Sequence, residues 1–517
     1  MTVSPHQQLP LRLKNGGQTS GTESPESTIA ELKAIVQDLV NRCKALHSEV
    51  EAYVAAVEEK KLTKTADPVE YRPLRTEIKT ELDFLQKLIE TKSGPEKIRN
   101  HISSSNLVYW EALWAAAKRS EGLLAFRKYF FWNRQQDGLR APYQGLSLGK
   151  GAQMKGKTAA LADIVARDGR EWIRISTMSE KKLLFDLAKL GWRNDSDSDS
   201  DADGDDAVKD PLKEEDDEDE VPIVKQAREL ARAARANPIC GNQPQVRLVL
   251  TRIQSGKHKE VDRTLDKIRA TGAIVQCSNE ISPAPTLQDV LPKLLVDRSR
   301  TLTDTLNIDC TILLALISDI SHQDCPILDW YPGEVRAQIK EERREKLLPT
   351  HLYPAIGSRS MVCTQEAADQ MYVIVDTLAT DTEKTRASLL LGQRQYSSLP
   401  QPELRRRWQG LSVYPMPAEF QLPIKVVPSN IEALYQKLPN VAKDVAKTLD
   451  TPVNQAIFLY GWGNGITTLS SNRARARQIE SVLNEKGLKD GEAGPHIWLC
   501  GESRSLIAKQ GRRRQEN

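Results

Sequence analysis

Apolar residues between positions 28 and 57 recur at alternating steps of three and four, with polar residues between them. A run of this period forms one stripe along a long helix. Thr28 and Glu31 have the spacing of a capping box, which marks a helix start. The stripe consists of Ile29, Leu32, Val36, Leu39, Cys43, Leu46, Val50, Tyr53 and Val57.

A second helix is predicted from about Leu74. Its apolar face consists of Ile78, Leu82, Leu85 and Ile89. Because Pro68 and Pro73 interrupt the chain between the two helices, we expect an antiparallel hairpin inside one domain. A dimeric coiled coil is the alternative, and either arrangement offers a docking element for protein partners.

The segment 103–132 places Ser and Asn residues before an aromatic-rich run, which predicts a helix. Four of its aromatic residues recur at helical spacing and are interpreted as core, with an RNA-stacking surface as the alternative: Tyr109, Trp110, Trp114 and Phe126. The stretch "LADIVARDGREWIRIS" predicts a β-hairpin that turns at Asp168–Gly169. An amphipathic helix over about 179–190 closes this N-terminal region.

Strand and helix patterns alternate after residue 222, and such alternation predicts a mostly parallel sheet flanked by helices. Expected helices cover about 224–235, 261–269 and 333–347, and expected strands cover 245–253, 273–277 and 360–364. Polar, Pro-rich sequence fills about 395–425. From residue 455 the pattern predicts strand, glycine turn, strand, helix and strand. "GWGNG" (461–465) is interpreted as that turn, because it lacks the third glycine of a dinucleotide-binding loop.

Charge divides the chain unevenly, although the formal net charge is only +3. Residues 195–220 hold 15 acids and 2 lysines, so the rest has 71 basic and 55 acidic residues. An acidic segment this poor in apolar residues is expected to be a disordered linker, and the basic remainder fits either a phosphate-bearing partner or a solvated surface. Ser196, Ser198 and Ser200 stand among its acids as candidate phosphorylation sites.

The expected organisation follows from these patterns. It is a disordered N-terminus (1–27), a mainly helical domain with a β-hairpin (28–193), the acidic linker (194–221), an α/β region (222–510) with its core at about 295–505, and a basic tail (511–517). Seven scattered cysteines without a CxxC motif indicate free thiols. With no apolar run of membrane-spanning length and no signal peptide, we expect no membrane partner and a cytoplasmic or nuclear location.

Polar residues stand at three expected strand-to-helix junctions. Asp309 follows "TLNI" and precedes the apolar run "ILLALI", with Thr311 two residues on; Glu366 follows "SMVCT"; Asn472 follows "ITTLSS". Because ligands of parallel sheets bind where strands end, these residues are candidate site residues. Each is also explained by an ordinary role at a helix start, as a cap or a first-turn acid.

Several segments resemble domain-of-unknown-function family 1308, a eukaryotic family of uncharacterised proteins whose C-terminal domain is classed as PIN-like. The similar segments are "IKTELDFLQKLIE", "SSSNLVYWEAL", "ADIVARDGREWIRI", "LNIDCTILLALIS", "CTQEAADQM" and "TLSSNRARARQI". The resemblance rests on their order over about 400 residues. It implies a three-layer α/β/α sandwich for the C-terminal domain.

The resemblance also implies chemistry. Active PIN-like domains hold Mg²⁺ or Mn²⁺ on acidic residues and hydrolyse RNA, so Asp309 and Glu366 correspond to metal-binding acids and Thr311 to a hydroxyl neighbour. Asn472 stands where active members usually carry another Asp. Two hypotheses follow: a metal-dependent ribonuclease or RNA-processing factor, or a catalytically degenerate scaffold that binds RNA or protein. Asp319, Asp369 and Asp376 are further candidate acids, and Arg473, Arg475 and Arg477 are candidate RNA contacts.

Overall fold

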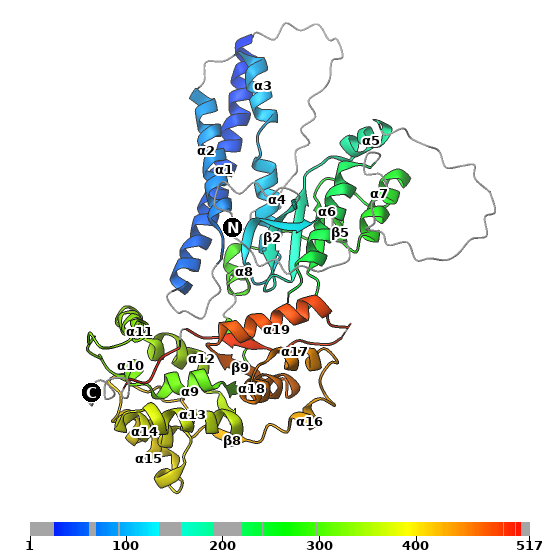
Figure 1. Cartoon of the computed structure of the whole chain (residues 1–517). Coiled ribbons are helices and arrows are strands. Elements are labelled where there is room, and N and C mark those ends of the chain that lie inside the picture. Colours follow the sequence, from blue (N-terminus) through cyan, green and yellow to red (C-terminus); the bar gives the residue numbers. More distant parts are fainter. Residues whose placement is uncertain are drawn as a thin grey trace, which may run out of the picture. The chain divides into compact units, whose positions relative to one another are not determined.

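The computed structural model divides the chain into two compact units (Figure 1). The first contains the described residues up to Ser48 and Thr76–Val108, and the second contains Glu49–Arg75 and everything from Tyr109 onward. The structure describes residues 25–61, 69–90, 94–133, 157–189, 220–239, 241–295, 298–489, 491–501 and 503–507. Residues 1–24 of the predicted disordered N-terminus, most of the acidic linker with Ser196, Ser198 and Ser200, and the basic tail lie outside these residues. The last three residues of that N-terminus, 25–27, are helical, so the predicted boundary is wrong there.

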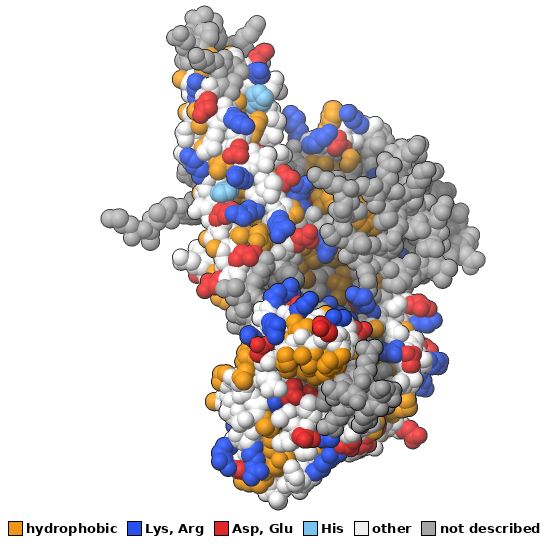
Figure 2. Space-filling model, turned by 60° about the vertical axis from the view of Figure 1, so that its left-hand side comes forward, with side chains coloured by type: hydrophobic (Ala, Val, Ile, Leu, Met, Phe, Trp, Pro, Cys, Tyr) orange, Lys and Arg blue, Asp and Glu red, His pale blue; other side chains and the backbone are white. Residues whose placement is uncertain are grey.

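The first unit is built from α1 (Pro25–Lys61) as far as Ser48, α2 (Arg72–Glu90) from Thr76 onward, and α3 (Pro95–Ser103). The remaining residues of α1 and α2 belong to the second unit. The predicted stripe of α1 is confirmed, since all its members from Leu32 to Val57 are buried. The Cys43 thiol contacts the Ile78 carbonyl oxygen of α2 at 3.9 Å. On the face shown in Figure 2, basic and acidic side chains are interspersed over these helices.

The predicted helix over 103–132 is wrong in its second half. Helix α4 (Leu107–Lys118) ends early, and β1 (Ala125–Asn133) follows as a strand. "AFRKYFFWN" is rich in aromatic residues that favour strands, and pairing with a neighbouring strand overrides the helical spacing. The interpretation of the aromatic residues as core is confirmed for Trp110, Trp114 and Phe126.

The first sheet has the order β1-β2-β3-β4-β5. Its further strands are β2 (Lys157–Ala166), β3 (Glu171–Ser176), β4 (Gln245–Leu250) and β5 (Ile274–Cys277). The predicted hairpin is the antiparallel β2–β3 pair, but β3 also pairs in parallel with β4. Two strands from beyond the acidic segment therefore complete this sheet, and the expected boundary at residue 222 does not separate the two sheets. Its helices are α5 (Glu180–Lys189), α6 (Pro222–Ala236), α7 (Lys259–Ala270) and α8 (Leu287–Leu294).

The second sheet confirms the predicted parallel α/β architecture of the C-terminal region. Five strands in the order β10-β9-β6-β7-β8 all run parallel. They are β6 (Thr305–Ile308), β7 (Ser360–Thr364), β8 (Lys425–Val427), β9 (Thr467–Ser470) and β10 (Ile497–Leu499). The helices between them are α9 (Cys310–Ile317), α10 (Asp319–His322), α11 (Gly333–Arg344), α12 (Tyr353–Ile356), α13 (Gln365–Leu378), α14 (Asp381–Leu390), α15 (Gln401–Gln409), α16 (Ile431–Leu434), α17 (Ala442–Thr448), α18 (Pro452–Gly463) and α19 (Arg473–Lys486). Short helical turns cover Arg298–Thr301, Leu348–Leu352 and Arg394–Tyr396.

Each face of the central strand of this sheet is buried. Leu306 and Ile308 of β6 join a large apolar core with α9, α12, α13 and α14. Between them Asn307 points the other way, and its amide donates to the Ile457 carbonyl of α18 at 2.8 Å. The central strand is therefore covered on both sides, as parallel sheets require.

Two predicted elements differ from the structure here. Residues 455–460, expected as a strand, belong to α18 together with Gly461 to Gly463 of the expected glycine turn. The Pro-rich segment 395–425 contains helix α15, which begins with Pro402 in its first turn, where proline is tolerated. None of the helices in the described part of the chain has the length and apolarity needed to cross a membrane.

Candidate functional site

Three strand ends bring the predicted site residues to one edge of the second sheet. The central strand β6 pairs with β7 and β9, where Asn307 lies opposite Val362 on one side and Thr468 on the other. Because all three strands are parallel, their carboxyl ends meet at the same edge. Asp309 directly follows β6, Glu366 lies two residues beyond β7, and Asn472 lies two residues beyond β9.

Asp309 is held by two hydroxyl groups, one from the helix that it precedes and one from the end of β9. It occupies the N-cap position of α9, but its side chain makes no capping hydrogen bond. Its Oδ2 atom accepts hydrogen bonds from Thr311 Oγ1 at 2.8 Å and from Ser470 Oγ. Both hydroxyls also accept backbone N–H groups, Thr311 from Ser471 at 3.1 Å and Ser470 from Asn472 at 2.9 Å. The carboxyl group therefore ties the end of β6 to the end of β9.

Burial dominates the electrostatics of this carboxyl group. The residue is 2% exposed. Desolvation raises the pKa of Asp309 above its usual range, while the hydrogen bonds from Ser470 and Thr311 oppose that shift. The neighbouring Cys310 thiol is also buried, and desolvation together with the Asp309 charge raises its pKa to about 12. Folding thus places a carboxyl group where the charged form is costly.

The Asp309→Asn substitution tests this cost. A carboxyl group whose pKa is raised by folding destabilises the native state once the pH rises through that pKa. The substituted chain is therefore expected to gain stability relative to wild type as the pH rises from 5 to 8. Urea unfolding in the presence of a chelator measures the difference. If Asp309→Asn instead lowered the free energy of unfolding equally at pH 5 and pH 8, the fold would require Asp309 in its ionised form, as a hydrogen-bond acceptor.

Glu366 lies in the first turn of α13 and contacts the neighbouring strand end. Its Oε1 atom accepts a hydrogen bond from Ser429 Oγ at 2.6 Å, two residues beyond β8. Its Oε2 atom is buried without a hydrogen-bond partner among the described residues. A buried oxygen of this kind has unused capacity to bind a cation.

Asn472 has a structural use that engages its oxygen. It is the N-cap of α19, and its Oδ1 atom accepts the Arg475 backbone N–H at 3.2 Å. The three predicted residues therefore share an edge. Ser470 links the Asp309 carboxyl group to the Asn472 backbone N–H, but among the described residues no hydrogen bond joins the three side chains to one another. Asp309 and Glu366 supply the hard oxygens that Mg²⁺ or Mn²⁺ prefers, but the amide oxygen that would complete the set is occupied. No group of three or more His, Cys, Asp or Glu residues with metal-binding geometry occurs in the described part of the chain.

The three arginines that follow Asn472 occupy the first two turns of α19. Arg475 pairs with Asp450 at 2.6 Å and donates to Gln478 at 2.7 Å. Arg473 and Arg477 are exposed, and neither forms an ion pair with another described residue. This first turn has no acidic residue. Cations here oppose the helix dipole, so these side chains bring positive charge to the site edge at a cost.

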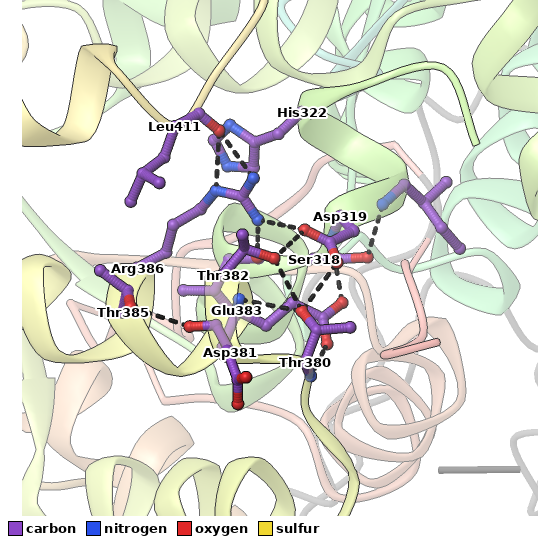
Figure 3. A network of polar contacts seen from close by, with 12 residues as sticks. Ser318, Asp319, His322, Thr380, Asp381, Thr382, Glu383, Thr385, Arg386 and Leu411 are labelled. Atoms are coloured by element: carbon purple, nitrogen blue, oxygen red, sulfur yellow. Dashed lines mark hydrogen bonds and ion pairs between the residues drawn. The ribbon is translucent and has the colours of Figure 1, made fainter. Parts of the chain in front are cut away.

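The further candidate acids have partners elsewhere. Asp369 accepts from Gln365 at 2.8 Å, and Asp376 pairs with exposed Arg394 at 2.9 Å. Asp319 belongs to a buried network (Figure 3), in which it pairs with Arg386 at 2.7 Å. None of the three has a hydrogen bond or ion pair to Asp309 or Glu366 among the described residues.

Sequence reasoning missed two members of the site, Ser470 and Ser429. Each lies at or just beyond the end of a strand, and each donates its hydroxyl to one of the predicted acids. The available signal was the position of each serine at or just after a strand, because the carboxyl ends of all strands in a parallel sheet lie at the same edge. A serine at such a position carries no charge, so the sequence alone gives no reason to select it as a site residue.

A comparison with known protein families supports part of the sequence-based interpretation, whereas a comparison with solved structures adds nothing to it. No solved structure matches the chain. Residues 306–409 match the family model described as "Protein of unknown function (DUF1308)". The match spans β6 to α15 and includes both Asp309 and Glu366. The family resemblance expected from the sequence is thereby confirmed for residues 306–409, which are similar to the DUF1308 family.

Proposed function

We propose that this chain is an RNA-binding protein with a PIN-like C-terminal domain whose metal site is incomplete. In this function the carboxyl edge of the second sheet binds the RNA backbone, and the helical N-terminal unit contacts protein partners. The observation that carries the proposal is Asn472. It stands in place of a third acid and uses its oxygen to cap α19.

Two further observations support a polyanionic partner such as RNA. The exposed Arg473 and Arg477 project from the helix that starts at this edge. The chain outside residues 195–220 has 71 basic and 55 acidic residues, which favours a polyanionic partner. Interspersed charges on the visible face of the first unit (Figure 2) fit a protein-contacting or solvated surface better than a phosphate-binding one.

A metal-dependent ribonuclease is the second candidate, and the unpartnered Glu366 Oε2 atom favours it. In that function Asp309 and Glu366 would hold a divalent cation, which when bound activates water for attack on a phosphodiester. The hydroxyls of Thr311 and Ser470 orient the Asp309 carboxyl group in either case.

Removing the two exposed arginines tests RNA binding. The Arg473→Ala/Arg477→Ala chain is expected to bind single-stranded RNA about tenfold more weakly, and the salt dependence of log K should fall by about 0.7 for each phosphate that the chain no longer neutralises. Fluorescence anisotropy with a labelled oligonucleotide at several salt concentrations measures both values. The matched control is Arg336→Ala/Lys340→Ala, which removes two exposed charges from α11. Equal weakening by both pairs would reduce the effect to net charge and contradict a site on α19.

The same preparations separate the two candidates. Wild-type chain incubated with RNA and millimolar Mg²⁺ or Mn²⁺ is expected to leave the oligonucleotide intact, and calorimetry is expected to detect no binding of either ion. RNA cleavage by wild type that is lost in Asp309→Asn, with RNA binding retained, would establish the ribonuclease instead.

A further inference from the structure

The last described residues of the chain, 503–507, lie against the C-terminal domain as an extended segment, here called the C-terminal strap. The strap follows β10 after Gly501, whose positive φ of 58° is a conformation that favours glycine. It has no helical or strand structure of its own. Its residues contact the α9–α10 junction and α11. Successive residues make different kinds of contact: an ion pair, backbone hydrogen bonds and apolar packing.

Arg504 is buried against a partner that is also buried. Its Nε and Nη2 atoms donate to Glu342 Oε2 of α11 at 3.0 and 2.9 Å, and the two side chains are 2% and 5% exposed. The other Glu342 oxygen accepts the Leu347 backbone N–H at 3.0 Å. Charged side chains are almost never this buried unless they are paired. The groove thus has one position that selects a cation.

Ser505 is recognised through its backbone. Its N–H donates to Gln338 Oε1 at 2.7 Å, and its carbonyl accepts from Ser318 Oγ at 2.8 Å. Using both backbone groups of a residue is how extended peptides are held in grooves. Ser318 directly precedes Asp319 of the buried network in Figure 3, so this contact joins the strap to a fixed part of the domain.

The two residues that follow are aliphatic and pack on separate apolar clusters. Leu506 is buried in the main core of the domain. Ile507 packs against the smaller cluster of α10 and α11, which contains Ile320, Tyr331 and Ile339. The strap therefore presents an arginine, a backbone-bonded serine and two aliphatic side chains. Each feature is matched by a different wall of the groove.

The groove continues beyond the strap as a pocket of about 180 Å³. Ile320, Ile339 and Glu342 line this pocket and also contact the strap or its cluster, and Lys346 and Tyr414 form part of the far wall. This opening lies beside the docked strap, and release of the strap also withdraws Leu506 from the main core.

We propose that the groove between the α9–α10 junction and α11 is a peptide-binding site selective for an arginine followed by a small residue and two aliphatic residues. The chain's own strap fills it within the same molecule, and the strap of a second copy fills it in trans when its own is released. The strap pairs with no strand, so its release leaves the hydrogen bonds of the sheet intact. The exchanged contacts are identical to the original ones, which makes such exchange a low-cost route to a dimer. This inference is independent of RNA binding.

Charge reversal tests the exchange directly. In Glu342→Arg the groove rejects Arg504 of the same chain, and in Arg504→Glu the strap is rejected by Glu342. When the two variants are mixed, each groove finds its complementary strap only on the other chain. We expect neither variant alone to associate and the equimolar mixture to form one-to-one dimers, detected by light scattering and native mass spectrometry.

The double variant Glu342→Arg/Arg504→Glu is the control, because it restores the pair within one chain and is expected to remain a monomer. A second measurement uses the milder Arg504→Gln chain and a labelled peptide of residues 501–507. This chain should bind the peptide at least tenfold more tightly than wild type, whose strap competes, and Glu342→Arg should not bind it. If the mixture stays monomeric and Arg504→Gln binds the peptide no better than wild type, while the double variant is folded, the groove is no peptide site and the proposal fails.

Discussion

The Gly461→Ala substitution is expected to lower the free energy of unfolding of the C-terminal domain by about 1–3 kcal/mol. A Cβ atom at this position of α18 would lie 2.0 Å from Thr468 Oγ1 and 3.3 Å from the Asn307 amide nitrogen. Asn307 and Thr468 are buried, and they hydrogen-bond to each other at 3.0 Å. The extra methyl group must therefore displace the helix or break a buried polar contact on the central strand. Either outcome costs stability.

The sign of this effect is what makes it informative. Replacing glycine by alanine inside a helix ordinarily stabilises it by about 0.5–1 kcal/mol. Gly333, the first residue of α11, is the matched control, because no atom lies within 4 Å of a Cβ built there. Chemical denaturation should show Gly333→Ala to be neutral or stabilising and Gly461→Ala to be destabilising. Similar changes in the two variants would mean that α18 does not approach the sheet this closely.

The same glycine explains why part of the fold could not be predicted. "QAIFLYGWG" is apolar on every side because α18 is buried between the sheet and neighbouring helices, and such a run has no period that separates helix from strand. Its two glycines favoured a turn, whereas the structure uses Gly461 for close packing. In contrast, α1 faces solvent on one side, so its stripe was visible and its burial pattern was predicted correctly.

Long-range pairing was a second limit. The strands β4 and β5 were recognised as elements, but nothing in their sequences indicates that β4 pairs with β3 across the acidic segment. For the candidate site, the strand-end argument correctly located Asp309, Glu366 and Asn472 on one edge. The same argument could not predict which residues these three side chains contact. The partners of the two acids, Ser470 and Ser429, are 161 and 63 residues away in the chain.

The Arg386→Met substitution is expected to destabilise the C-terminal domain by about 3–5 kcal/mol, because it removes the countercharge of a buried network. Arg386 pairs with Asp319 and also donates to the carbonyl groups of Ile317 and Leu411 (Figure 3). Glu383 lies in the same network, and its two oxygens accept the backbone N–H groups of Asp319 and Thr380 at 2.9 Å. Without the guanidinium group, two buried carboxyl groups face each other.

This deficit is expected to grow with pH. Burial raises the pKa of Glu383 to about 7, and Arg386 opposes that shift, so its removal raises the pKa further. A carboxyl group with a raised native pKa stabilises the fold while it holds its proton and loses that contribution as the pH rises through the native pKa. Urea unfolding at pH 5.5 and pH 8 should therefore give the smaller loss at pH 5.5.

Arg406→Met is the matched control for that measurement, since it removes an arginine from the next helix, α15, whose ion pair is exposed. Arg406 is 76% exposed and pairs with Glu403 at 2.8 Å. An ion pair of this kind contributes little to the free energy of unfolding, because water solvates both charges when the pair is broken. Comparable losses in the two variants, or a loss in Arg386→Met that does not depend on pH, would show that the guanidinium group acts by filling space. The expected contrast instead makes charge balance the requirement for joining α10 to α14, the same α10 whose preceding residue, Ser318, holds the C-terminal strap.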